Sequence, residues 1–540
     1  MKIALAQYNF HVGNISSNRK KIEEGIRLAE QEDVDILVFP ELSLLGYPPL
    51  DLMEYDGLIE EIDRQLAFLL SRVGDMLVIL GCPTKNTTKG GKPFYNSALA
   101  IHKGQIIFRA DKTLLPSYDI FDEDRFFQAN NQFDLLVYKG KKIALSICED
   151  LWFNEMPFYS LDPIKELAKL CPDFMINLSA SPFDINKVES RVLLVQQCSI
   201  TLKAPVFYVN QVGANTDILF DGASIITNNK GELLKVGSVF KESFIISDIE
   251  DSVPSNIESV SREKRLFDAL VVGIKDYFVK SGFNKAILGL SGGIDSALVA
   301  VLAVEALGKE NVRCFLMPSE YSSDHSISDA VSLAENLGIQ FDILPINSSY
   351  SQVLSDMSTY FENKPFNVAE ENLQSRLRGM FLMAISNKHG YIVLNTTNKS
   401  EMAVGYGTLY GDMCGGISVI GDVYKTDVYK ICKYLNDSGE IIPENILTKA
   451  PSAELRPNQK DTDSLPEYDV LDQVLYAYIE EHRSKKSLLN ILPDKEIIEK
   501  VIGLVNKAEY KRYQSAPVLR VSTKAFGMGR NVPIVASFDF

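Results

Sequence analysis

The chain has 540 residues, too many for one ordinary hydrophobic core, so several domains or two large ones are expected. Hydrophobic residues make up 46% and charged residues 23%, a composition typical of globular proteins. The formal net charge of −16 argues against nucleic acid or an anionic membrane as the main partner. Seven scattered cysteines without a CxxC pair exclude a disulfide framework and a structural zinc cluster, and they indicate a reducing, cytoplasmic location.

Short apolar, β-rich runs alternate with helical segments in the first half of the chain. They predict buried strands over residues 2–9, 35–40, 76–81, 142–147, 174–178 and 205–210. An amphipathic helix is expected over residues 16–31, and hairpins over 96–109 and 224–236. The alternation predicts a layered α/β domain with a mixed sheet over residues 1–250.

Residues 251–262 are polar, contain one proline and lack helical periodicity, so they are the predicted linker. The remaining residues, 263–540, form the second predicted domain. Its expected helices cover residues 263–280, 296–307, 324–337 and 369–388, and its expected strands cover 286–290, 312–317, 341–345 and 391–394. This alternation predicts a Rossmann-like, doubly wound parallel sheet. Residues 455–468, polar and with two prolines, are expected to be a mobile loop without a packed face.

The sharpest motif is a glycine-rich turn, LGLSGGIDS at residues 288–296, between an expected strand and an expected helix. Backbone N–H groups and the helix dipole converge there, which is a geometry that binds phosphate. The turn has neither the lysine of a Walker A loop nor a GxGxxG pattern. The expected phosphate-binding residues are Gly289, Leu290, Ser291, Gly292, Gly293, Ile294, Asp295 and Ser296, and Asp295 is also expected to hold Mg²⁺.

This motif resembles the loop of the N-type ATP pyrophosphatases, which transfer AMP from ATP to a carboxylate or carbonyl before a nucleophile displaces it. Three further segments, ENLQSRLR at 371–378, NTTNKSE at 395–401 and KAPSAEL at 449–455, resemble the NAD synthetase family in the same order. The resemblance covers about residues 263–511. It implies ATP contacts from Thr396, Lys425 and Ser452, deamido-NAD contacts from Asn372, Glu401 and Lys511, and Mg²⁺ ligands in Asp295 and Glu401.

Three residues at the ends of expected strands in the first half have the chemistry of an amide-cleaving site. The thiolate of Cys148 attacks an amide carbonyl if a nearby cation lowers its pKa and a base accepts the proton. Glu41 is the candidate base, and Lys112 is the candidate for stabilising the oxyanion. Each residue taken alone also has a purely structural explanation, because cysteines are often buried and strand ends often carry exposed charges.

Together, Glu41, Lys112 and Cys148 resemble the Glu-Lys-Cys triad of the nitrilase superfamily, whose fold is a four-layer αββα sandwich. The resemblance implies that Tyr118, Ser181 and Lys187 bind glutamine and that Glu123 is a second glutamate near the nucleophile. None of the five histidines lies in the sequence context of a catalytic histidine, and residue 2 is lysine. Glutaminases of the Cys-His-Glu type and of the N-terminal-cysteine type are therefore excluded.

A nitrilase-like amidase followed by an ATP pyrophosphatase resembles the glutamine-using branch of the NAD synthetase family. The resemblance implies that ammonia from glutamine displaces AMP from adenylated deamido-NAD, with Mg²⁺ accompanying ATP. It also implies a homo-oligomer whose other partners are small-molecule substrates. Two alternatives stay open: an amide ligase for a different acid, and a nucleotide-binding regulatory protein with inactive sites.

Overall fold

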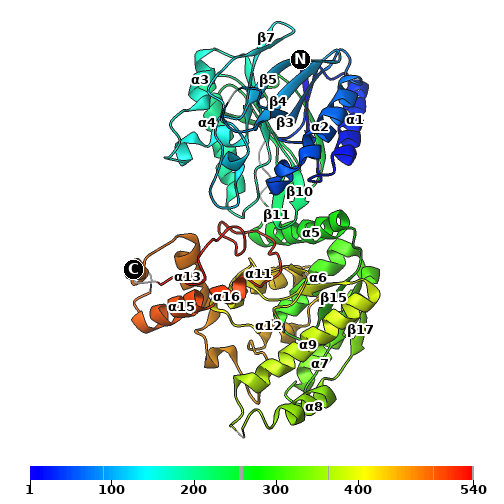
Figure 1. Ribbon diagram of the computed structural model, residues 1–540, viewed down its shortest axis with the longest axis vertical. Coiled ribbons are helices and arrows are strands. Elements are labelled where there is room, and N and C mark those ends of the chain that lie inside the picture. The colour runs from blue at the N-terminus through cyan, green and yellow to red at the C-terminus, as the bar shows by residue number, and fades with distance from the viewer. Residues whose placement is uncertain (89, 255–259, 363, 491, 538–540) are drawn as a thin grey trace. The chain divides into compact units, whose positions relative to one another are not determined.

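The computed structural model describes all residues except 89, 255–259, 363, 491 and 538–540. The chain divides into two compact units, Met1–Ser259 and Val260–Phe540 (Figure 1). Part of the predicted linker, residues 255–259, lies outside the described residues. Every helix within the described part of the chain is too short or too polar to cross a membrane.

The first unit is built on two six-stranded mixed sheets. One sheet has the order β14 (Ser243–Asp248), β1 (Lys2–Gln7), β2 (Ile36–Val38), β3 (Leu77–Lys85), β4 (Phe94–His102) and β5 (Gln105–Asp111). The other has the order β13 (Leu233–Val236), β12 (Ile225–Thr227), β9 (Val206–Asn210), β8 (Phe174–Ser179), β7 (Lys141–Ile147) and β6 (Leu136–Tyr138). A separate two-stranded ribbon pairs β10 (Val212–Asn215) with β11 (Ile218–Asp221). Strands β1, β2 and β3 are parallel, as are β7, β8 and β9, whereas the remaining pairings are antiparallel.

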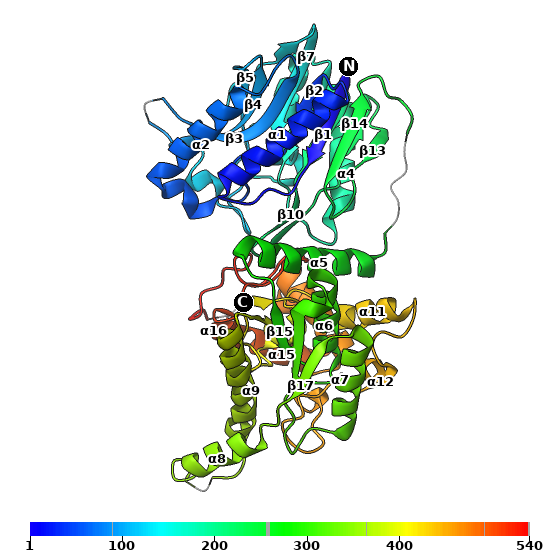
Figure 2. The ribbon, with the colours of Figure 1, turned by 90° about the vertical axis from the view of Figure 1, so that its right-hand side faces the viewer.

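Helices cover the outer face of each sheet (Figure 2). The helices α1 (Ile15–Gln31) and α2 (Asp56–Leu70) lie on the first sheet, and α3 (Pro163–Lys169) and α4 (Lys187–Leu202) lie on the second. Successive strand residues point to opposite faces, so Ile3 packs against the other sheet while Ala4 packs under α1. The expected four-layer αββα sandwich is confirmed.

The second unit contains a five-stranded parallel sheet. Its order is β17 (Gln340–Ile343), β16 (Val312–Leu316), β15 (Ala286–Gly289), β18 (Ile392–Asn395) and β19 (Ile417–Ser418). The first strand, β15, lies in the middle, so the chain order reverses beside it. Ligands bind at such a switch point in open α/β sheets, at the carboxyl ends of the strands. The glycine-rich turn follows β15 and therefore lies at this point.

The helices of the second unit complete a doubly wound fold, as expected. They are α5 (Arg262–Ser281), α6 (Ile294–Leu307), α7 (Asp324–Leu337), α8 (Asn347–Met357), α9 (Val368–His389), α10 (Lys399–Val404), α11 (Lys425–Asn436), α12 (Glu444–Thr448), α13 (Tyr468–Leu475), α14 (Lys485–Leu488), α15 (Lys495–Lys507) and α16 (Glu509–Arg512). Neither α8 nor the helices after α9 were predicted from the sequence. Most of the latter have eight residues or fewer, too few for a clear apolar period, whereas α11 and α15 are longer.

The expectation that residues 455–468 lack a packed face was wrong. Leu455, Asp461, Leu465 and Tyr468 are buried, and Asp461 begins a short helical turn. Gln374 of α9 donates from Nε2 to the carbonyl oxygen of Leu455 at 2.9 Å. The packed residues are few and irregularly spaced, so they leave no periodic signal in a polar sequence.

The interface between the two sheets of the first unit predicts where substitutions destabilise it. Ile176 of β8 is fully buried there, so Ile176→Ala should lower the free energy of unfolding by about 2–5 kcal/mol through lost contacts and a residual cavity. Val137 of β6 is 64% exposed, and Val137→Ala should change it by less than about 0.5 kcal/mol. Denaturant titration of the full chain measures both; equal effects would contradict the assigned layers.

Candidate active sites

The first candidate site gathers Glu41, Lys112 and Cys148 at one edge of the sandwich. These residues follow β2, β5 and β7, respectively, and their exposed fractions are 0%, 1% and 7%. The ammonium group of Lys112 donates to Glu41 Oε1 at 2.7 Å and to Glu123 Oε1 at 2.7 Å. Gly81 makes the position of Glu41 possible, because a Cβ atom at residue 81 would lie 2.2 Å from the backbone nitrogen of Leu42.

Glu123 is the second carboxylate on Lys112. Its Oε1 also accepts the hydroxyl of Tyr47 at 2.8 Å. Burial, with Glu41 close by, raises the pKa of Glu123 to about 7 against the lowering effect of Lys112. Burial would lower the pKa of Lys112, but the charges of Glu123 and Glu41 outweigh it and raise that pKa well above its usual value. Lys112 is therefore a permanent ammonium group in this site.

Cys148 directly follows β7 and has a backbone φ of +39°, in a region that non-glycine residues rarely adopt. Such strain is often found at functional residues. The charge of Lys112 does act to lower the pKa of this thiol, but burial and the charge of Glu41 outweigh it and raise that pKa overall. The thiol is therefore protonated at rest, and Glu41 is the carboxylate whose charge acts on it most strongly.

Asp150 holds the segments of Lys112 and Cys148 together. Its Oδ1 accepts the backbone N–H groups of Thr113 and Leu114, each at 2.9 Å, and its Oδ2 accepts that of Ile147 at 2.9 Å. Thr113 follows Lys112 directly and Ile147 precedes Cys148, so one buried carboxylate fixes the relative position of both residues. The sequence analysis missed Asp150, although it stands two residues after the candidate nucleophile.

The three predicted glutamine-binding residues lie around this triad. Tyr118 donates its hydroxyl to Glu149 Oε1 at 2.8 Å, and the charge of Lys187 acts on the same carboxylate. Ser181 is buried and follows Ala180, whose N–H donates to Glu41 Oε2 at 2.9 Å. Glu149, adjacent to Cys148, was not singled out from the sequence; its Oε1 also accepts the hydroxyl of Tyr159 at 3.2 Å.

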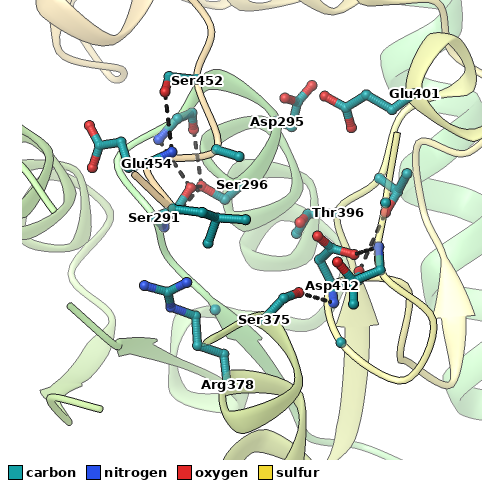
Figure 3. A pocket seen from close by; sticks show the side chains of 18 of the residues that line it. Ser291, Asp295, Ser296, Ser375, Arg378, Thr396, Glu401, Asp412, Ser452 and Glu454 are labelled. Carbon is teal, nitrogen blue, oxygen red and sulfur yellow. Dashed lines mark hydrogen bonds between the residues drawn. The ribbon is translucent and has the colours of Figure 1, made fainter. Parts of the chain in front are cut away.

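The second candidate site is a pocket of about 460 Å³ at the switch point of the parallel sheet (Figure 3). All the residues assigned from the sequence to ATP or deamido-NAD line it: residues 289–296, Asn372, Thr396, Glu401, Lys425, Ser452 and Lys511. They come from the ends of β15 and β18, from the start of α6, from α9, α10, α11 and α16, and from the segment after α12. Residues far apart in the chain therefore meet in one cavity.

The glycine-rich turn is shaped for close approach of a ligand. Gly292 has a φ of +77°, and a Cβ atom there would lie 2.2 Å from the carbonyl oxygen of Ser326. Ser291 Oγ accepts the N–H of Gly293 at 3.2 Å and lies 3.1 Å from Ser296 Oγ. Because α6 begins at Ile294, its positive end faces the pocket beside the turn.

One end of the pocket carries clustered carboxylates. Lys425 is bonded to Asp295 Oδ2 and lies 3.4 Å from Glu401 Oε1, while Asn398 Nδ2 donates to Asp295 Oδ1 at 3.0 Å. Burial, with Asp295 and Asp461 nearby, raises the pKa of Glu401 to about 8 against the lowering effect of Lys425. Carboxylate oxygens of this kind are the donors that Mg²⁺ prefers in proteins. Among the described residues no group of three metal-ligating side chains is found, so such an ion would complete its shell with water and ligand oxygens.

Asp461 joins this end of the pocket from the segment that was expected to be a loop. It is 4% exposed and accepts the hydroxyl of Tyr468 at 2.9 Å, and its Oδ1 has no hydrogen bond among the described residues. The sequence analysis missed it, because an aspartate in a polar stretch carries no signal of its own.

The other predicted residues are held by local bonds. Asn372 Oδ1 accepts the hydroxyl of Thr408 at 2.8 Å, and Lys511 donates to the carbonyl oxygens of Gly405 and Gly407, each at 2.8 Å. Ser452 donates to the carbonyl oxygen of Gln459 at 2.6 Å. These bonds fix the walls of the pocket.

Comparison with known proteins finds two family models on this chain. Carbon-nitrogen hydrolase matches residues 2–255, and NAD synthase matches residues 266–515. Two proteins named glutamine-dependent NAD(+) synthetase, from Synechocystis sp. and Acinetobacter baylyi, are 45% and 42% identical to it; each alignment covers 99% of this chain, and 99% and 98% of the relative, respectively.

A solved structure gives the same result. The glutamine-dependent NAD+ synthetase from Acinetobacter baumannii, solved in complex with ADP, is 39% identical with a TM-score of 0.78, and the match covers 99% of this chain and 98% of that one. Two candidate sites, two family models and full-length relatives agree: the chain belongs to the family of glutamine-dependent NAD(+) synthetases.

Proposed function

We propose that this protein converts deamido-NAD to NAD+ with ATP, using ammonia that it releases from glutamine. The observation that carries the proposal is that a single chain holds both a Glu-Lys-Cys site and a nucleotide pocket lined by the residues expected for this chemistry. The expected products are NAD+, AMP, pyrophosphate and glutamate.

In the first unit, Glu41 would take the proton of Cys148 as the sulfur attacks the carboxamide carbon of glutamine. The ammonium of Lys112 has one N–H beyond its two carboxylate bonds, and its charge would stabilise the oxyanion. Collapse of the tetrahedral intermediate breaks the carbon–nitrogen bond, and Glu41 returns the proton to the leaving ammonia. Water, deprotonated by Glu41, then hydrolyses the glutamyl thioester.

In the second unit, the backbone N–H groups at residues 291–293 and the start of α6 would hold the phosphates of ATP. The nicotinate carboxylate attacks the α-phosphorus, and the bond to the departing pyrophosphate breaks. Ammonia then adds to the acyl carbon, AMP leaves, and the amide nitrogen loses a proton. Asp295 and Glu401 would hold Mg²⁺, which when bound supplies positive charge to the phosphates.

We also propose a cytoplasmic homo-oligomer. All seven cysteines are free thiols, which supports a reducing compartment. Leu193 and Ile200, seven residues apart on α4, are 67% and 50% exposed, and apolar side chains on one helix face support a contact with a second copy.

One assay tests the reaction. Purified protein is incubated with deamido-NAD, ATP and Mg²⁺, with either glutamine or ammonium chloride, and NAD+ and AMP are quantified by chromatography. The proposal expects NAD+ and AMP in equal amounts from both nitrogen sources. AMP without NAD+, or AMP formation only when another acid replaces deamido-NAD, would favour a different amide ligase, and no AMP at all would favour a regulatory protein.

The nucleophile gives the first site-specific prediction. Cys148→Ala should abolish NAD+ synthesis from glutamine and leave synthesis from ammonium within about twofold, because only the first unit loses its reacting atom. Cys171→Ala, at an exposed thiol, is the matched control and should behave as the wild type. Glutamine hydrolysis retained in Cys148→Ala would refute the triad.

The phosphate turn gives the second prediction. Asp295→Asn should reduce AMP formation with both nitrogen sources by about 100-fold or more, because it removes the charge expected at the metal. Glutamine hydrolysis by the same variant should persist. Near-normal NAD+ synthesis from ammonium would show that Asp295 only supports the start of α6.

Asp150 gives the third prediction. Asp150→Asn brings an amide group to three backbone donors and leaves at least one unsatisfied, at a cost of about 1–3 kcal/mol in unfolding free energy. Glutamine hydrolysis should fall at least about tenfold, through kcat more than KM, while ammonium-driven synthesis is retained. An unchanged kcat would mean that Asp150 does not position Lys112 and Cys148.

A further inference from the structure

The nucleotide pocket contains a guanidinium group whose terminal nitrogens have no partner among the described residues. Arg378 of α9 lines the pocket, and its Nε donates to the carbonyl oxygen of Met317 at 2.9 Å. That bond fixes the side chain at the end of β16. The other N–H donors of the guanidinium group make no hydrogen bond or ion pair with the described part of the chain. Burial lowers the pKa of Arg378 to about 10, while Asp412 and Glu454 oppose this only from a distance.

The other cations that line the pocket are already engaged. Lys425 is paired with Asp295 and Glu401, and Lys449 with Glu454 at 2.8 Å. Lys511 donates to two backbone carbonyl oxygens. Within the described lining, Arg378 is therefore the cation that lacks both a counter-ion and a full set of acceptors.

Its position separates it from the carboxylate end of the pocket. Figure 3 shows Arg378 across the pocket from Asp295 and Glu401, on the side of Ser291. An arginine two positions earlier, Arg376, is exposed and donates to the carbonyl oxygen of Leu409, outside the pocket lining. Arg378 alone of the two thus points its charge into the cavity.

A desolvated guanidinium costs free energy unless an anion compensates it. Its planar fork matches the geometry of phosphate oxygens, and arginine is favoured where phosphate is bound through two parallel hydrogen bonds. The glycine-rich turn contains no lysine, so its neutral N–H groups leave most of the charge of a nucleotide's phosphates unbalanced. The guanidinium group of Arg378, on that side of the pocket, can balance part of this phosphate charge.

We propose that Arg378 binds a phosphate group of the substrates, at the side of the pocket opposite the carboxylates. The proposal rests on the proposed function, which brings two phosphate sources to this pocket: the α-phosphate of ATP, which remains in AMP, and the pyrophosphate bridge of deamido-NAD. Arg378 binds and orients this phosphate through charged hydrogen bonds, and takes no part in proton transfer.

The test compares ligands with and without a phosphate. Isothermal titration calorimetry without Mg²⁺ measures the binding of AMP, adenosine and deamido-NAD to the full-length wild type, Arg378→Gln and Arg378→Lys. Loss of charged hydrogen bonds should weaken AMP binding about 10- to 100-fold in Arg378→Gln and leave adenosine binding unchanged. Arg378→Lys keeps the charge without the fork and should weaken AMP binding less.

Arg313→Gln is the matched control. Arg313 lies on β16, pairs with Asp342 at 2.6 Å and does not line the pocket, so all three ligands should bind this variant as they bind the wild type. A loss for deamido-NAD alone supports phosphate binding and assigns it to the dinucleotide. Unchanged binding of both AMP and deamido-NAD, or equal losses for AMP and adenosine, overturns the proposal.

Two further measurements keep the result interpretable. Thermal unfolding of each variant shows whether it is folded; if Arg378→Gln is not, the comparison of AMP with adenosine is made on Arg378→Lys. NAD+ synthesis by the wild type is measured in the same preparation. The Arg378 variants could bind AMP or deamido-NAD more weakly than the wild type does, while the wild type itself makes no NAD+. In that case the proposed function fails and the role of Arg378 stands.

Discussion

A buried ammonium group between two carboxylates organises both candidate sites. Lys112 joins Glu41 to Glu123 in the first unit, and Lys425 joins Asp295 to Glu401 in the second. None of these charges is stable alone in a low-dielectric interior, and removing one partner of such a pair commonly costs about 3–5 kcal/mol. The side chains that are placed for chemistry therefore also hold the strand ends and helix starts in position.

The lysine between two carboxylates has different consequences in the two sites. In the first, Lys112 keeps its proton, and burial together with the charge of Glu41 raises the pKa of Cys148, so the proposed attack requires a base to take the thiol proton. In the second, Lys425 pairs with both carboxylates at one end of the nucleotide pocket, and burial raises the pKa of Glu401 to about 8. The first arrangement supports the proposed base, and the second supports the proposed Mg²⁺ site.

Most of the fold follows from the sequence, because buried parallel strands and amphipathic helices leave strong periodic signals. The strand before Gly289 and the helix after it were both predicted, and their order along the chain places the turn at the switch point. Short elements such as α10 were missed, since six residues give too short a pattern, and the longer helices α2, α4 and α15 were also not predicted. The packed face of residues 455–468 was missed for a similar reason: four irregularly spaced buried side chains are enough to pack a segment that looks mostly polar.

Candidate residues could be predicted where they stand beside a strand end, as Glu41 and Cys148 do. Asp150, Asp461 and Arg378 could not, because their importance depends on what lies near them in space. Asp150 matters through three backbone N–H groups from two separate segments, and Arg378 through a lack of acceptors around it. The raised pKa of Cys148 was also beyond the sequence, since burial outweighs the charge of Lys112 that the motif suggests.

The central claim is that nitrogen passes from glutamine to the nicotinate carboxylate within one reaction. The most direct test supplies glutamine labelled with ¹⁵N in its amide, deamido-NAD, ATP and Mg²⁺, and follows the mass of the NAD+ formed. The account predicts NAD+ that carries the label in its carboxamide and one AMP for each NAD+. Unlabelled NAD+, or glutamate released without any NAD+, would contradict it.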